Sequence, residues 1–145
     1  MKWSAIFIES ICLLLILIFA YAAFSKIFDL GTLRTTIQQS PILSPFSAWL
    51  PFVVIGTEIL IALFLMFGKY RLRAMCVSFV MLFVFTVYIL FIKKFAKMLP
   101  CACGGIIQKL SWNQHLGFNL ILMALVLLAI VVHSRQSELK SLLQQ

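Results

Sequence analysis

Four long runs of apolar residues, separated by shorter polar segments, dominate the sequence. They cover residues 5–24, 50–68, 73–93 and 113–133. About 20 apolar residues cross a bilayer as a helix, and a spanning segment must satisfy its own backbone hydrogen bonds. No alternation typical of barrel strands is visible in the sequence. The pattern therefore predicts an all-α integral membrane four-helix bundle, with residues 1–145 forming a single membrane domain.

The polar segments between the runs differ in kind. Between the first two runs, two prolines follow a stretch whose apolar positions share one helical face, namely Leu30, Leu33 and Ile37. This predicts a short helix on the membrane surface and then a proline-broken return. Residues 68–73 are expected to form a tight turn, and 134–145 a polar C-terminal tail with frayed helix. The connection between the third and fourth runs is a loop that contains a C-x-C motif.

Composition adds the environment and the orientation. The chain is 63% hydrophobic and 11% charged, with a mean hydropathy of +1.11, so the bilayer must solvate most of it. The net charge of +8 does not indicate nucleic acid, because the cations fall between the apolar runs, where they meet headgroups. Each predicted face holds six cations, but the short 68–73 turn alone carries three, which favours the cytoplasm for its side. We therefore expect a multi-pass protein of the inner (cytoplasmic) membrane, with both termini cytoplasmic and the C-x-C loop outside.

Cys101 and Cys103 are the first candidates for chemistry. A disulfide between residues i and i+2 closes only if the backbone turns, and Pro100 and Gly104 supply residues that favour turns. A strained disulfide is readily reduced, which suits thiol–disulfide exchange on the oxidising side of the membrane. The same two thiolates could instead bind a soft metal ion, with His115 completing the site, or form an inert structural disulfide. These alternatives stay open at the level of the sequence.

Glu58 is the second candidate, because it lies about 12 Å along the helix from Trp49 and so near mid-bilayer. An ionisable group there normally faces the bundle interior or a polar cavity. Glu58 could act as a proton acceptor or form a hydrogen bond to a bound small molecule such as a quinone. Alternatively, it forms a hydrogen bond between helices that is purely structural.

Three other charged positions have simpler interpretations. Glu9 is nearer the opposite end of the first run, and we expect it either to snorkel to the membrane surface or to pair with Arg71 or Arg73 of the 68–73 turn. Lys26 and Asp29 stand three residues apart and are predicted to pair with one another.

Trp112, His115 and Asn119 share one face at the start of the fourth run, on the C-x-C side. His115 could accept a thiol proton. Trp112 and Asn119, with Glu58, are candidates to bind a quinone or another small molecule. The alternative is interfacial anchoring, for which Trp is well suited. Cys12 and Cys76 lie at different depths and are interpreted as packing residues.

Several stretches resemble a known group of proteins. The first run ends YAAFSKIFD at residues 21–29, and the second reads IGTEILIALFLMFG at 55–68. These resemble DoxX-like four-helix membrane proteins. The Cys101-Ala-Cys103-Gly104 loop is similar to that of the MauE-like branch, where Cys-Gly-Cys-Phe-Gly is usual.

The resemblance implies an accessory protein of the cytoplasmic membrane, because MauE is associated with the maturation of periplasmic methylamine dehydrogenase. It further implies a disulfide relay that passes electrons to a quinone. A periplasmic thiol or a thioredoxin-like protein would be the partner. The rival expectation is a non-catalytic subunit or maturation factor that binds a partner protein.

Overall fold

The computed structural model describes residues 2–40, 42–95 and 112–143. Within these ranges the chain forms helices and no strand, which confirms the all-α prediction. The elements are α1 (Lys2–Phe28), α2 (Leu30–Gln39), the 3-10 turn η1 (Ser44–Phe46), α3 (Leu50–Met66), the 3-10 turn η2 (Gly68–Tyr70), α4 (Arg71–Phe95) and α5 (Trp112–Leu143).

Three of these helices are long and apolar enough to cross a membrane, in the stretches Trp3–Phe28, Gly68–Phe91 and Asn113–Gln136. The fourth apolar helix, α3, has 17 residues, or about 26 Å at 1.5 Å per residue, slightly less than the ~30 Å hydrocarbon core. Together the four helices form the membrane bundle that the hydropathy pattern predicts.

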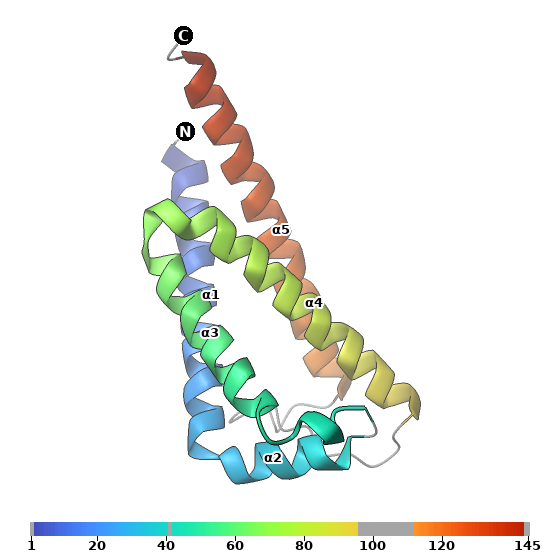
Figure 1. The fold of residues 1–145 in the computed structure, drawn as a ribbon. Helices are drawn as coiled ribbons and strands as arrows, with labels where there is room; N and C mark the ends of the chain where they lie inside the picture. Colours follow the sequence, from blue (N-terminus) through green and yellow to red (C-terminus); the bar gives the residue numbers. More distant parts are fainter. Residues whose placement is uncertain (1, 41, 96–111, 144–145) are drawn as a thin grey trace.

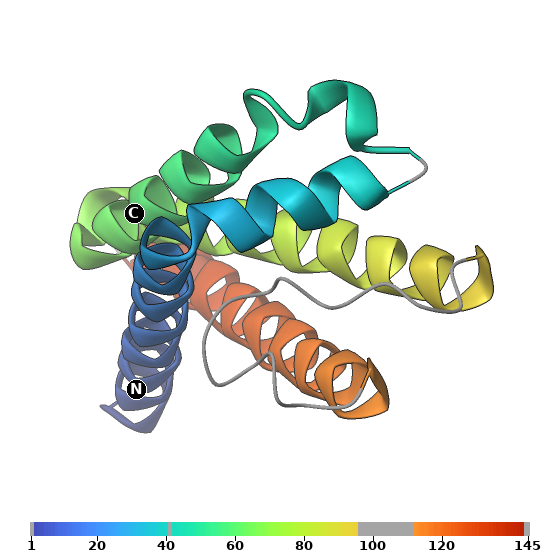
Figure 2. The same cartoon turned by 90° about the horizontal axis from the view of Figure 1, so that it is seen from below.

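The four apolar helices pack as a ring in which α1 contacts α3 and α5, and α4 contacts α5 and α3. The first residues of α1, the α3–α4 turn and the last turns of α5 lie at one end of the bundle (Figure 1). The end of α1, the start of α3, the end of α4 and the start of α5 lie at the other end, which α2 crosses. Viewed from that end, α2 and η1 lie side by side (Figure 2).

The main core holds a fully buried side chain from each helix of the ring: Leu15, Leu65, Met75 and Val126. A second, smaller cluster attaches α2 to the bundle through buried Ala23, Leu33, Ile37 and Ile55, with Leu30 packed against it. The apolar face predicted for the surface helix is therefore confirmed. Asp29 separates α1 from α2 and caps α2, because its carboxylate accepts a hydrogen bond from the backbone N–H of Thr32.

Helix α5 is longer than its apolar run. The sequence predicts residues 134–145 as a polar tail with frayed helix, and in the structure this helix is an unbroken continuation of α5 to Leu143. The reason is local, since residues 134–143 contain neither glycine nor proline and favour helix despite their polarity. The side chain of Gln136 donates a hydrogen bond to the Ser4 hydroxyl oxygen, which joins this extension to the start of α1.

Replacing Leu15 by alanine tests the main core. Leu15 is completely buried, so Leu15→Ala should lower the free energy of unfolding by about 2–5 kcal/mol. Leu13→Ala is the matched control, because Leu13 is 59% exposed on the lipid-facing side of the same helix. Reversible unfolding in mixed micelles would measure both variants, and equal losses would contradict the packing described here.

Candidate functional site

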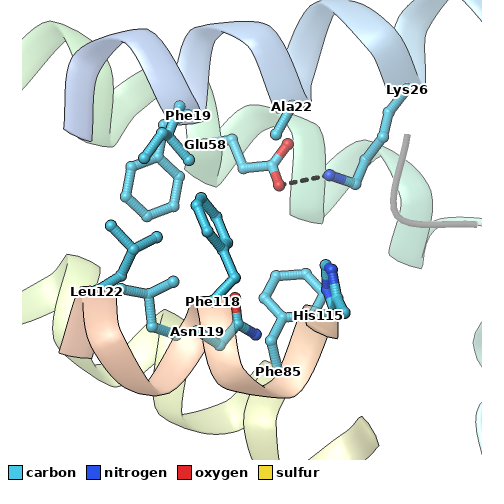
Figure 3. A pocket seen from close by; sticks show the side chains of 11 residues that line it. Phe19, Ala22, Lys26, Glu58, Phe85, His115, Phe118, Asn119 and Leu122 are labelled. Carbon is cyan, nitrogen blue, oxygen red and sulfur yellow. Dashed lines mark hydrogen bonds and ion pairs between the residues drawn. The ribbon is translucent and has the colours of Figure 1, made fainter. Parts of the chain in front are cut away.

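A buried ion pair joins α1 to α3. Lys26 Nζ lies 2.6 Å from Glu58 Oε1, and the two side chains are 5% and 3% exposed. Helical side chains lean toward the N-terminus of their helix. Lys26, in the last turn of α1, therefore reaches back into the bundle and donates its hydrogen bond to the carboxylate in the middle of α3 (Figure 3).

The pairing predicted between Lys26 and Asp29 is wrong. Asp29 is exposed and caps α2, whereas Lys26 is 4% exposed and turns inward. Sequence reasoning missed Lys26 as a partner of Glu58, although a signal was present. Both are charges associated with apolar runs, their signs are opposite, and a carboxylate in a bilayer needs a partner.

A cavity of about 60 Å³ lies beside the ion pair and is lined by all four helices of the ring. Figure 3 shows side chains of α1 and α3 pointing across it toward those of α4 and α5. Its polar lining consists of Lys26, Glu58, His115 and Asn119. The remaining lining side chains are apolar: Ile18, Phe19, Ala22, Leu82, Phe85, Phe118 and Leu122.

Two buried polar atoms in this cavity lack a hydrogen-bond partner among the described residues. They are Glu58 Oε2 and His115 Nδ1, and their residues are 2% and 6% exposed. Buried polar atoms are nearly always hydrogen-bonded. The cavity exceeds the roughly 15 Å³ that one water needs, so a water or a small polar group has room beside these residues.

The Lys26 ammonium also lies 5.9 Å from the centre of the Phe85 ring, within the range of a cation–π interaction. Lys26 is thus held by the carboxylate of α3 and by an aromatic face of α4. The cation is positioned by three helices while one oxygen of Glu58 is left for other hydrogen bonds.

The structure brings together three of the predicted site residues, namely Glu58, His115 and Asn119, all of which line the cavity. Trp112 begins α5, but its side chain is outside the described part of the chain. Cys101 and Cys103 also lie outside the described residues, so the disulfide and metal interpretations stay predictions. Over the described ranges, no three His, Cys, Asp or Glu residues gather as potential metal ligands.

The opposite end of the bundle carries the ion pair predicted for Glu9, in which Glu9 is exposed and Arg71 is partly buried. Arg71 Nη1 lies 4.0 Å from Glu9 Oε1, and the Glu9 side chain is 68% exposed. Cys12 is buried and Cys76 exposed, and both are free thiols, as expected for residues that do not pair with each other.

Four apolar helices around a buried charge pair and a polar cavity define a multi-pass membrane protein with a site inside its bundle. The chain belongs to the MauE family: the model of that family, described as "Methylamine utilisation protein MauE", matches residues 4–132. The match confirms the MauE-like part of the resemblance and makes this a membrane protein of methylamine utilisation. No curated protein and no solved structure matched the chain.

Removing one partner of the buried pair should destabilise the bundle strongly. Lys26→Met leaves the Glu58 carboxylate without its cation, and we expect a loss of about 3–5 kcal/mol in unfolding free energy. Arg71→Met, which breaks the partly exposed pair with Glu9, is the matched control and should lose about 1 kcal/mol or less.

The double variant Lys26→Met/Glu58→Met should recover much of the stability that Lys26→Met loses, because two apolar groups replace the pair. Unfolding curves of the single and double variants form a thermodynamic cycle. Strictly additive losses would show that the two groups do not interact.

Proposed function

We propose that this protein is a membrane thiol–disulfide redox accessory protein. Its C-x-C motif exchanges a disulfide with a partner protein or a small thiol, and a quinone accepts the electrons. The observation that carries the proposal is the cavity with its two unpartnered polar atoms. Two of its polar lining residues, Lys26 in the last turn of α1 and His115 in the first turn of α5, are at the end of the bundle where residues 96–111, with the C-x-C, connect Phe95 of α4 to Trp112 of α5.

The first half-reaction takes place at the sulfur atoms. A thiolate of the reduced partner attacks the Cys101–Cys103 disulfide, forming a mixed disulfide and releasing one cysteine thiolate. The partner's second thiolate then attacks the mixed bond, so the partner leaves as a disulfide and both cysteines remain as thiolates. These thiolates take up the two protons that the partner's thiols released on ionising, so two electrons and two protons have entered the protein.

In the second half-reaction the dithiol would be oxidised back to the disulfide, and a quinone, if bound at the cavity, would supply the acceptor for the two electrons and two protons. The described residues supply proton handling. Glu58 Oε2 accepts and returns a proton or hydrogen bond, and His115 exchanges one at Nδ1. Asn119 and Trp112 complete the proposed binding set.

The same proposal includes the orientation. The C-x-C connection faces the periplasm, where disulfides persist, and both termini face the cytoplasm in the inner membrane. A periplasmic thiol or thioredoxin-like protein is the proposed electron donor.

A non-catalytic membrane subunit that binds and stabilises a partner is the second candidate function. The observation in its favour is that Glu58 already has a structural partner, Lys26, at 2.6 Å. In that role the C-x-C would be a permanent disulfide and the cavity would hold water.

The reduction potential of the Cys101–Cys103 pair separates these functions. For a relay we expect a reversible potential of about −120 to −270 mV, measured by alkylation and mass spectrometry in a series of redox buffers. A disulfide that resists reduction above about −300 mV indicates a structural role, and a pair that stays reduced throughout contradicts the relay and makes metal content the next measurement. Cys12→Ser/Cys76→Ser is the control and should leave the potential unchanged.

His115→Gln tests the proposed proton transfer. The reoxidation of the dithiol by a quinone should slow by about 100-fold, because the amide cannot exchange a proton as imidazole does. Exchange with a small disulfide should keep its rate. His133→Gln, at the other end of α5, is the control. Equal rates for the two variants would exclude His115 from the reaction.

A further inference from the structure

The geometry points to an amphiphilic ligand for the cavity: we propose that it binds a neutral hydroxyl-bearing headgroup whose hydrocarbon tail leaves sideways into the bilayer. The inference deepens the proposed function by giving the entry route and the chemical class of the molecule at this site. It rests on the proposed function for the ligand's redox role, whereas binding itself depends on the cavity alone.

Two sets of residues line the cavity. We call the four buried polar residues its polar floor, and the apolar residues that reach the surface its rim. All four polar lining residues are at least nine-tenths buried, since Lys26, Glu58, His115 and Asn119 are 4%, 2%, 6% and 5% exposed. The lining residues that reach the surface are apolar: Ile18 and Phe85 are half-buried, and Phe118 is exposed. A molecule that enters past this rim meets hydrocarbon first and hydrogen-bonding groups afterwards.

The rim lies at the depth of the hydrocarbon. Its residues belong to the three stretches long and apolar enough to cross the membrane. Ile18 lies ten residues before the end of α1, and Phe118 six residues after the start of α5, or about 15 and 9 Å along each helix. Helices α1 and α5 diverge toward this end of the bundle (Figure 1). Entry at this depth is from lipid.

Two of the four polar lining residues, Lys26 and His115, lie closer to the membrane surface than the rim, whereas Glu58 and Asn119 lie at about its depth. Lys26 is two residues from the end of α1, and His115 is three residues from the start of α5. These positions are about 3 and 5 Å from the helix ends. A guest would therefore direct its headgroup toward the surface and its tail toward the membrane interior, in the orientation of an ordinary membrane amphiphile.

The charges of the floor favour a neutral headgroup. The Lys26 cation and the Glu58 anion compensate each other at 2.6 Å, so a charged guest would be buried without a counter-ion. Glu58 Oε2 is a free acceptor and requires a donor such as a hydroxyl. The Asn119 amide and the His115 ring can bond to a second oxygen, as donor or acceptor. Quinols and neutral glycerolipids share this chemistry.

The test is direct binding to the full chain in detergent, kept reduced throughout so that no electrons move. The probes are tritiated decylhydroquinone and tritiated 1-decanoylglycerol, read by scintillation proximity. Saturable binding of either supports the inference, and the probe that binds identifies the source. If neither binds, the inference is overturned, whatever the measured potential of the cysteine pair.

Two variants test the geometry. Phe118→Trp enlarges a rim side chain and should weaken binding by about fivefold or more. Phe83→Trp makes the same change on the lipid-facing side of α4, where Phe83 is 52% exposed, and should change the binding affinity by less than about twofold.

The dimethyl ether of decylhydroquinone tests the headgroup. It has no donor for Glu58 Oε2 and should bind about tenfold more weakly. Equal effects of the two tryptophans, or an ether that binds as well as the hydroquinone, would refute the proposed pose.

Discussion

The ion pair between Lys26 and Glu58 fixes how the bundle is assembled at one end. A single charge in a bilayer costs several kcal/mol, and each of these two groups is almost entirely buried. Their 2.6 Å contact compensates both charges only if the last turn of α1 lies beside the middle of α3. The register of these two helices is therefore set by electrostatics, and the surrounding apolar packing must agree with it.

A buried ion pair is a poor device for stability alone, since well-packed apolar residues often do as well. The rest of this bundle shows that apolar packing was available, because the fully buried apolar side chains Leu15, Leu65, Met75 and Val126 belong to one hydrophobic cluster in the main core. The pair makes sense as a means of placing a polar site inside a membrane. It supplies hydrogen-bonding groups while the floor of the cavity remains neutral overall.

Hydropathy and periodicity were enough to predict the four apolar helices and the buried face of α2, because both depend on residue order alone. The full length of α5 was not predicted. The apolar run ends after residue 133, but the polar residues that follow it still favour helix. His115 and Asn119 were placed on one face by their spacing. They line one cavity with Glu58 and Lys26 because of which helices are neighbours and because the lysine side chain leans toward the N-terminus of its helix. Sequence spacing gives neither of these two facts. The roles of Cys101 and Cys103 rest on the sequence and its resemblance.

A neutral polar cavity inside the bundle has a consequence for the proposed relay. Small thiols and protein thiolates are charged or large, so the desolvation of an anion next to Glu58 would oppose their entry. Thiol exchange must then occur at the membrane surface, on the connection between α4 and α5. A carrier that is neutral in both redox states suffers no such penalty and dissolves in lipid. In the proposed relay the two half-reactions thus take place in two different media.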